Sequence, residues 1–116
     1  MVLTSLYVFV GGGTGAVLRY LVSLFSANVL RGAHWGTLLV NVIGAGLIYL
    51  LNSKGVIQTK EIDAGIKVGL LGGLTTFSTF SYEVFKLLEQ GKLALGMTYF
   101  GLNIILGIVV MVIIFR

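Results

Sequence analysis

The residues best suited to chemistry gather in one apolar stretch, which runs from Gly69 to Glu83. Phe77 and Phe80 are three positions apart, so they share one face of a helix. Because a phenyl ring has a positive edge, two rings presented edge-on beside hydroxyl donors would line a path for a small anion. The alternative is that both rings pack in a core or face lipid. The hydroxyl residues beside the rings are Ser78, Thr79 and Ser81.

The same stretch predicts a break in a helix. Gly72 and Gly73 are followed by Thr75 and Thr76, and adjacent glycines with two β-branched residues make a poor helix. Hydroxyl and amide side chains can satisfy the backbone groups that such a break leaves free. Broken helices at mid-membrane commonly form ion sites, where free carbonyls face cations and free N–H groups face anions. We therefore expect a break at these residues, inside a membrane span.

Four further polar side chains lie inside apolar segments. The amide of Asn41 offers two donors and one acceptor, so it suits an interhelical hydrogen bond or an anion site. Arg19 suits a structural anchor that snorkels to the interface or a vestibule that attracts anions. Tyr99 and Asn103 are four positions apart and share a helix face. They extend a polar track, or they serve as an interfacial tyrosine and a lone hydrogen-bonding asparagine.

Residue spacing also predicts several contacts. Glu83 lies three residues before Lys86, which favours a surface ion pair between them. Small residues four positions apart let two helix backbones approach closely in a membrane. Two such pairs are Gly11/Gly15 and Gly69/Gly73.

The elements that position these residues must lie in lipid. The chain has 116 residues, of which 57% are hydrophobic and 10% charged, and its mean hydropathy is +1.04. A soluble domain has about 25% charged residues, and a short chain keeps much of its surface exposed. These values exclude a conventional soluble enzyme. The basic residues are scattered singly, so no nucleic-acid partner is expected. There are no cysteines, which excludes disulfides and thiolate metal sites.

A membrane-spanning helix needs about 20 apolar residues, and four segments are candidates. They are residues 2–27, 35–51, 62–88 and 93–115. Four such spans leave room only for short loops. The sequence therefore predicts one all-α domain over residues 1–116, a multi-pass membrane protein with four transmembrane helices and a broken third helix.

The charges that flank the spans show almost no bias between the two sides of the membrane. Orientation follows the Lys/Arg excess of short loops, and here four basic residues stand against three. We expect the chain to insert in both orientations and to pair with an inverted second copy about a two-fold axis. Glycine pairs such as Gly69/Gly73 would allow the close approach of the copies. The N-terminal side carries Lys54, Lys60, Lys67 and Arg116, and the other side carries Arg31, Lys86 and Lys92.

Three motifs resemble the Fluc/CrcB family of small bacterial fluoride channels. They are Gly-Gly-x-x-Gly-Ala-x-x-Arg-Tyr ending at Tyr20, Gly-Thr-Leu-x-Val-Asn-x-x-Gly over 36–44, and Gly-Gly-x-Thr-Thr-Phe-Ser-Thr-Phe-Ser-x-Glu over 72–83. The resemblance covers essentially the whole chain in length, number of spans and order of motifs. The third motif is the specific one.

This resemblance implies a passive fluoride exporter of the bacterial inner membrane, an antiparallel dual-topology homodimer with two pores. It implies that the carbonyls of Gly72 and Thr75 hold a structural sodium ion at the dimer axis. Family members often carry serine at the position of Asn103. The implied fluoride-pore residues are Asn41, Phe77, Phe80, Ser81, Thr79, Ser78, Tyr99 and Asn103.

Three alternatives compete with a channel. A small multidrug-type transporter also has four spans, but its proton coupling needs a carboxylate in the first span, where this chain has Arg19 and no acid. An intramembrane enzyme would need a cluster of acid, base or metal-binding groups, and His34 is the only histidine. A purely structural subunit does not explain a broken span rich in phenylalanine and threonine. We therefore expect no enzymatic activity.

Overall fold

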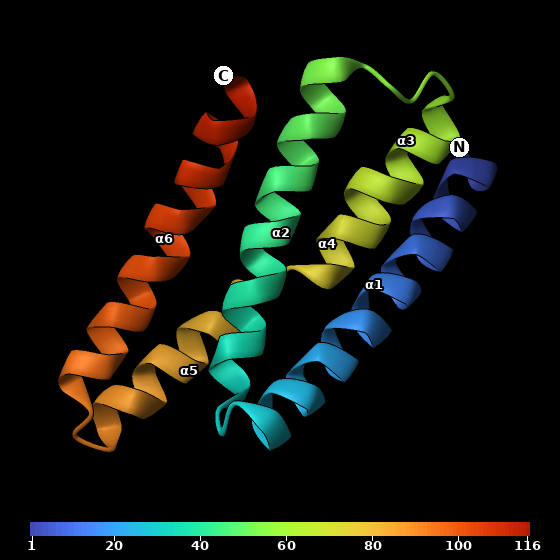
Figure 1. Cartoon of the computed structure of the whole chain (residues 1–116). Coiled ribbons are helices and arrows are strands. Elements are labelled where there is room, and N and C mark those ends of the chain that lie inside the picture. Colours follow the sequence, from blue (N-terminus) through green and yellow to red (C-terminus); the bar gives the residue numbers. More distant parts are fainter.

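The structure is a computed structural model that describes residues 1–116, and every regular element in it is a helix (Figure 1). Three helices are long and apolar enough to cross a membrane, namely α1 (Val2–Val29), α2 (Ala33–Lys54) and α6 (Leu93–Phe115). The predicted all-α membrane class is therefore confirmed for three spans. The shorter elements are α3 (Lys60–Ala64), the π-helical η1 (Gly65–Leu71), α4 (Gly72–Leu74) and α5 (Ser78–Glu89).

The long helices end where the sequence stops favouring a helix. α2 ends at Gly55, whose φ of 55° lies in the left-handed region that glycine adopts without steric cost. The turn between α5 and α6 passes through Gly91, whose φ is 75°. The predicted segments 2–27 and 35–51 lie inside α1 and α2, and the predicted segment 93–115 coincides with α6.

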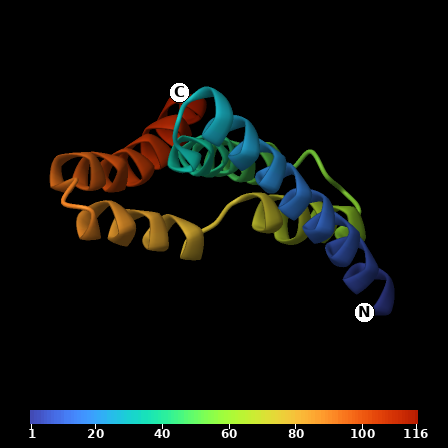
Figure 2. The same ribbon diagram turned by 90° about the horizontal axis from the view of Figure 1, so that it is seen from below.

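The third apolar segment is interrupted where the glycine–threonine pattern predicts. Helical structure stops at Leu74, and Thr75 is extended, with φ −85° and ψ 158°. Helix resumes at Ser78, so the break comprises residues 75–77. Figure 2 shows the chain drawn out between α4 and α5, with α1 alongside the first half and α6 alongside the second. The two halves therefore pack against different helices.

Glycine contacts hold the first half against α1. A Cβ atom on Gly11 would meet the Gly65 carbonyl, and one on Gly15 would meet the Leu70 carbonyl. Cβ atoms on Gly69 and Gly73 would likewise meet the backbone of α1. The predicted close packing through these pairs is confirmed. The prediction that Gly69/Gly73 allow the approach of a second copy is wrong, because α1 of the same chain already covers them.

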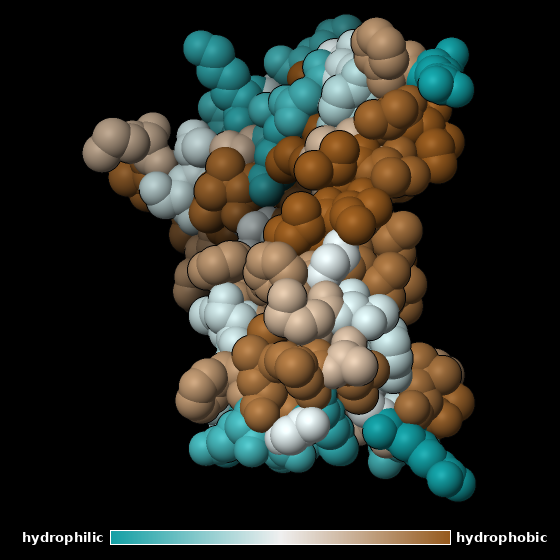
Figure 3. All heavy atoms as spheres, turned by 90° about the vertical axis from the view of Figure 1, so that its left-hand side faces the viewer, coloured by the Kyte–Doolittle hydropathy of each residue, from teal (hydrophilic) through white to brown (hydrophobic).

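The exterior of the molecule is mostly apolar. Only 15 of the 116 residues are buried, and large apolar side chains face outward along every long helix. Figure 3 shows apolar side chains across the middle of one face and hydrophilic residues at its two ends. The small buried core consists of Phe80, Leu87 and Tyr99, where α5 meets α6. A surface of this kind is stable in lipid rather than in water.

Candidate functional site

The amide of Asn41 takes the place of helical hydrogen bonds at the break. The Thr76 N–H donates to Asn41 Oδ1 at 2.9 Å, and Asn41 Nδ2 donates to the Thr76 carbonyl at 3.1 Å. The same Nδ2 donates to Asn103 Oδ1 at 3.0 Å. Of the two roles left open for Asn41, the interhelical hydrogen bond is the one observed. The broken backbone is therefore fixed to both α2 and α6.

Two carbonyls at the break lose their helical donors. In a continuous helix the Thr76 N–H would donate to the carbonyl of Gly72, but here it donates to Asn41. The Thr79 N–H would donate to the carbonyl of Thr75, but it donates to Thr76 Oγ1 at 3.2 Å. No other backbone N–H reaches either carbonyl. The two residues proposed as cation ligands thus keep free carbonyl oxygens.

Arg19 reaches the break from α1. Its Nε donates to the carbonyl of Gly73 at 3.0 Å, across the glycine contact between α1 and α4. The contact caps a third carbonyl that the interruption leaves without a helical donor, since Phe77 is no longer in register with Gly73. Arg19 is therefore a structural anchor by its contacts, although it binds the break rather than snorkelling to the interface.

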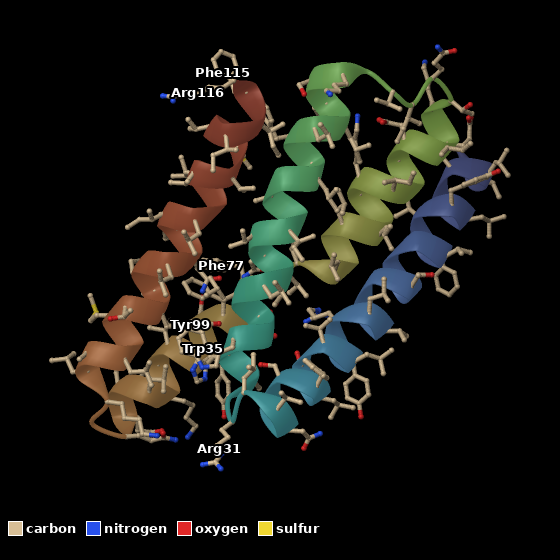
Figure 4. The ribbon with its side chains drawn as sticks, in the orientation of Figure 1. Arg31, Trp35, Phe77, Tyr99, Phe115 and Arg116 are labelled. Atoms are coloured by element: carbon tan, nitrogen blue, oxygen red, sulfur yellow. The ribbon has the colours of Figure 1, made fainter.

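The two phenylalanines have very different surroundings. Phe80 is only 4% exposed, and its ring centroid lies 5.5 Å from that of Tyr99 and 5.9 Å from that of Phe100. Phe77 is 78% exposed, with its ring centroid 6.1 Å from that of Phe80. Figure 4 shows Phe77 and Tyr99 near the middle of the molecule, with Arg31 and Arg116 at opposite ends. An aromatic pair thus runs from the core of α5 and α6 to an open surface.

A groove of about 540 Å³ opens beside the break, between α2, η1 and α6. It brings together six of the predicted site residues, and Thr76 and Lys67 join them. The groove does not contact Arg19, Tyr99 or the hydroxyl residues of α5. The predicted residues that line it are Asn41, Gly72, Thr75, Phe77, Phe80 and Asn103.

The hydroxyl residues of α5 lie outside the groove. Ser78 is exposed, and its Oγ lies 3.4 Å from Thr76 Oγ1. Thr79 and Ser81 are partly exposed, and neither side chain hydrogen-bonds within the chain. Their roles as pore residues stay a prediction for the assembled channel.

A second polar cluster lies beyond the core, and the sequence analysis missed it. Glu83 accepts a hydrogen bond from Tyr99 Oη at 2.6 Å and another from Thr37 Oγ1 at 3.1 Å. The predicted ion pair of Glu83 with Lys86 is wrong, because Lys86 pairs with Glu89 at 2.7 Å. The only signal in the sequence was that Thr37 and Glu83 both fall within the conspicuous motifs.

The two clusters are joined along α6. Asn103 Nδ2 donates to the carbonyl of Tyr99 at 3.1 Å, one turn earlier in the same helix. Asn103 therefore reaches Asn41 through its oxygen, while the Tyr99 hydroxyl reaches Glu83. These hydrogen bonds run along the inner side of α6 and favour the polar track among the two alternatives left open for Tyr99 and Asn103.

The chain is similar in sequence to known proteins over most of its length. Residues 6–115 match the family described as "CrcB-like protein, Camphor Resistance (CrcB)". The "Fluoride-specific ion channel FluC" of Shewanella loihica is 46% identical over 105 residues, which cover 87% of this chain and 84% of the relative. Proteins of the same name from Geobacter sulfurreducens and Clostridium perfringens are 48% and 40% identical, over 77% and 88% of this chain and 75% and 83% of the relatives. The chain therefore belongs to the CrcB-like protein family.

Proposed function

We propose that this protein is a passive fluoride-selective channel of the bacterial inner membrane and not an enzyme. Its relatives carry the name of a fluoride-specific ion channel, and the similarity covers most of their length. The observation that carries the proposal is the groove, which gathers two phenylalanine rings and two asparagine amides at a broken helix. Ring edges and amide N–H groups are the partners that suit a small anion in a dry path.

The hydrogen bonds around the break favour Asn103 as the amide that meets the anion. Asn41 Nδ2 has two N–H groups, and both are used, one on the Thr76 carbonyl and one on Asn103. Asn103 Nδ2 makes one hydrogen bond, to the carbonyl of Tyr99, and keeps a second N–H free. Asn41 then acts by fixing the break and the orientation of Asn103. A fluoride ion that leaves water needs such free donors to replace its hydration.

A proton-coupled multidrug transporter is not favoured. The acid that its coupling requires is absent from α1, whose only charged residue is Arg19. Glu83 lies on α5, and both of its carboxylate oxygens accept hydrogen bonds within the chain. We therefore propose that anion movement is uncoupled and driven only by the ion gradient and the membrane potential.

The interrupted segment Lys60–Glu89 is proposed as the fourth crossing. Its first half lies along α1 and its second half along α6, and it connects the end of α2 to the start of α6. With four crossings, the loop before α3 lies on the side of Arg116, and Arg31 lies on the opposite side, as Figure 4 places these two residues.

We further propose that the working unit is an antiparallel dual-topology homodimer with two pores. The balanced basic residues support insertion in both orientations, and the exposed Phe77 ring and open groove supply a surface for an inverted copy. The test is a tag on the C-terminus that is labelled from each side of native membranes. Labelling from both sides is expected, whereas labelling from one side alone would reject dual topology.

A structural sodium ion at the dimer axis is the cofactor that we propose. The chain offers no cluster of His, Cys, Asp and Glu side chains for a metal. The free carbonyls of Gly72 and Thr75 instead fit a hard monovalent cation, which carbonyl oxygens suit. Two carbonyls from each of two copies would supply its ligands. The ion would hold the two breaks together and would not be transported.

Purified protein in liposomes tests the function. Fluoride-loaded vesicles are expected to release fluoride when valinomycin lets potassium leave and balance the charge. Chloride-loaded vesicles are expected to release no chloride under the same conditions. Because no proton is coupled, a protonophore that collapses the pH gradient should leave fluoride release in place. Release that depends on a pH gradient would favour the transporter, and equal release of chloride would refute fluoride selectivity.

A further inference from the structure

We propose that Lys67, held by Asp63, is the cationic site that draws small inorganic anions into the groove, an inference that rests on the proposed channel function. Lys67 lies on η1 and is the only charged residue among those that line the groove. The sequence leaves two roles open for Arg19, a structural anchor or a vestibule residue that attracts anions. In the structure Arg19 does not line the groove, and its Nε is committed to the carbonyl of Gly73.

The ion pair of Lys67 is oriented. Lys67 Nζ lies 2.6 Å from Asp63 Oδ1, and the two side chains are 19% and 33% exposed. Asp63 belongs to α3, one turn earlier, and it does not line the groove. Of the two charged residues in the pair, only Lys67 belongs to the groove wall. We therefore expect an anion in the groove to meet the positive charge of Lys67 before the negative charge of Asp63.

Partial burial strengthens the attraction between Lys67 and an anion in the groove. Opposite charges attract more strongly in a partly buried site than in bulk water, because the effective dielectric constant is lower. A groove lined by one sign of charge raises the local concentration of counter-ions and the rate at which they arrive. The other side chains of this wall, such as Leu71, Ala45 and Ile48, carry no charge that would oppose it. Lys67 is therefore the one charged side chain of the groove wall that can favour an anion there.

Asp63 limits that attraction. A lone ammonium beside the pore would hold an anion tightly and would slow its departure, whereas conduction needs binding weak enough for release. The carboxylate of Asp63 offsets part of the charge and fixes the ammonium in place. Removing Asp63 alone should strengthen the attraction, and removing Lys67 alone should weaken it. The two variants thus shift conduction at low fluoride in opposite directions.

A Coulombic attraction of this kind does not select among anions. Lys67 acts on charge at a distance, so it should raise the arrival rate of fluoride and chloride alike. Selectivity would come from the narrow part of the path, where ring edges and amide N–H groups replace water. Lys67 is therefore a positioning residue for the ion. Replacing it should not change the preference for fluoride over chloride.

Fluoride flux from liposomes at low ionic strength tests the proposal, with Lys67→Gln, Lys67→Arg and Asp63→Asn as variants. We expect Lys67→Gln to lower the initial rate by about threefold, Lys67→Arg to retain it, and Asp63→Asn to raise it at low fluoride. Adding about 1 M of an impermeant gluconate salt shortens the Debye length to about 3 Å, so the rates of all variants should converge. Lys60→Gln is the matched control, because Lys60 is exposed and outside the groove.

Each other outcome overturns the proposal. A Lys67→Gln rate equal to that of the unaltered protein at low salt would remove the electrostatic role. A loss that persists at high salt would indicate a structural role, and a changed fluoride-to-chloride ratio would place Lys67 in the filter. If Lys67→Gln does not fold, a rate lowered in Asp63→Asn would still refute the proposal. Failure of the channel function itself would appear differently, as no fluoride release from the unaltered protein.

Discussion

Asn41 on α2 and Asn103 on α6 are joined by a hydrogen bond of 3.0 Å from Nδ2 of the first to Oδ1 of the second. The bond fixes the rotamer of both amides, because Asn41 also holds both backbone groups of Thr76. The amide nitrogen of Asn103 donates to the carbonyl of Tyr99, and Asn103 lines the groove. One side-chain contact therefore ties the shape of the broken backbone to the orientation of the amide that we propose for the anion.

Replacing Asn41 should disable the channel and weaken the fold. Asn41→Ala leaves the N–H and carbonyl of Thr76 without partners, a loss of about 1–3 kcal/mol per buried group. Asn41→Asp should reduce fluoride flux more than Asn41→Ser, because it adds a negative charge beside the path and removes the donor. Flux and unfolding temperature in detergent measure both effects. Asn52→Ala is the control, since Asn52 is exposed on the same helix and bonds only to the Ile48 carbonyl.

The two phenylalanines should respond differently to isoleucine. Phe77→Ile and Phe80→Ile should both cut fluoride flux, because the positive ring edge is lost while most of the volume is kept. Only Phe80→Ile should lower the stability of the chain, by about 1–2 kcal/mol, since it loses aromatic partners in the core. Phe9→Ile controls for a ring of similar exposure on α1. Normal flux in both variants would refute the pore assignment.

Adding a methyl group at Gly15 should separate α1 from η1 and α4. The new Cβ would collide with the Leu70 carbonyl, which belongs to the backbone and cannot rotate away. Overpacking of this kind costs about 1–3 kcal/mol, so Gly15→Ala should unfold at a lower temperature. Gly13→Ala, two residues earlier on the same helix, has open space around it and should match the unaltered protein. Equal unfolding temperatures for the two variants would contradict the close contact.

Tyr99→Phe removes the hydroxyl that donates a hydrogen bond to Glu83, and it should lower the stability of the protein. The Glu83 carboxylate would keep Thr37 as its only donor within the chain. A hydrogen bond to a charged group contributes about 1.5–3 kcal/mol, so the unfolding temperature should fall. Fluoride flux is expected to fall with it, because the cluster lies on the polar track along α6. Tyr82→Phe, at an exposed tyrosine of α5, should change neither quantity.

Removing sodium should destabilise the assembled dimer. A ligand that binds only the folded state raises the free energy of unfolding. The increase grows with the logarithm of the ratio of ligand concentration to dissociation constant. Replacing sodium by N-methylglucamine at constant ionic strength should therefore lower the unfolding temperature of the purified dimer. Fluoride flux driven by a fluoride gradient should carry no sodium with it. A stability that does not depend on sodium would count against the role proposed for the carbonyls of Gly72 and Thr75.

Much of the fold followed from local properties of the sequence. Segment length and apolar composition predicted the bounds of the long helices, and adjacent glycines and threonines predicted the break at residues 75–77. Small residues at Gly11 and Gly15 predicted a close backbone contact, which the structure makes with η1 and α4. These features depend on residues near one another in the chain, so spacing alone was sufficient.

The partners of individual polar groups did not follow from spacing. A shared helix face predicts an ion pair of Glu83 with Lys86. Glu83 instead bonds to Thr37, 46 residues earlier, and to Tyr99, 16 residues later. The sequence places Lys67 among the charges that flank the spans, whereas in the structure it lines the groove. Helices that are apolar on all sides give little indication of which face turns inward. Tertiary packing decides that choice, and the sequence pattern does not encode it.

The amide of Asn41 also has a consequence for the order of synthesis. Asn41 precedes Thr76 by 35 residues and Asn103 by 62, so Asn41 leaves the ribosome before either partner does. At about 5–20 residues per second, Thr76 follows about 2–7 s later and Asn103 about 3–12 s later. An unpaired amide is costly in hydrocarbon. We therefore expect newly made α2 to stay at the protein-conducting channel of the membrane until the broken segment arrives, because the Asn41 amide then gains its hydrogen-bond partners.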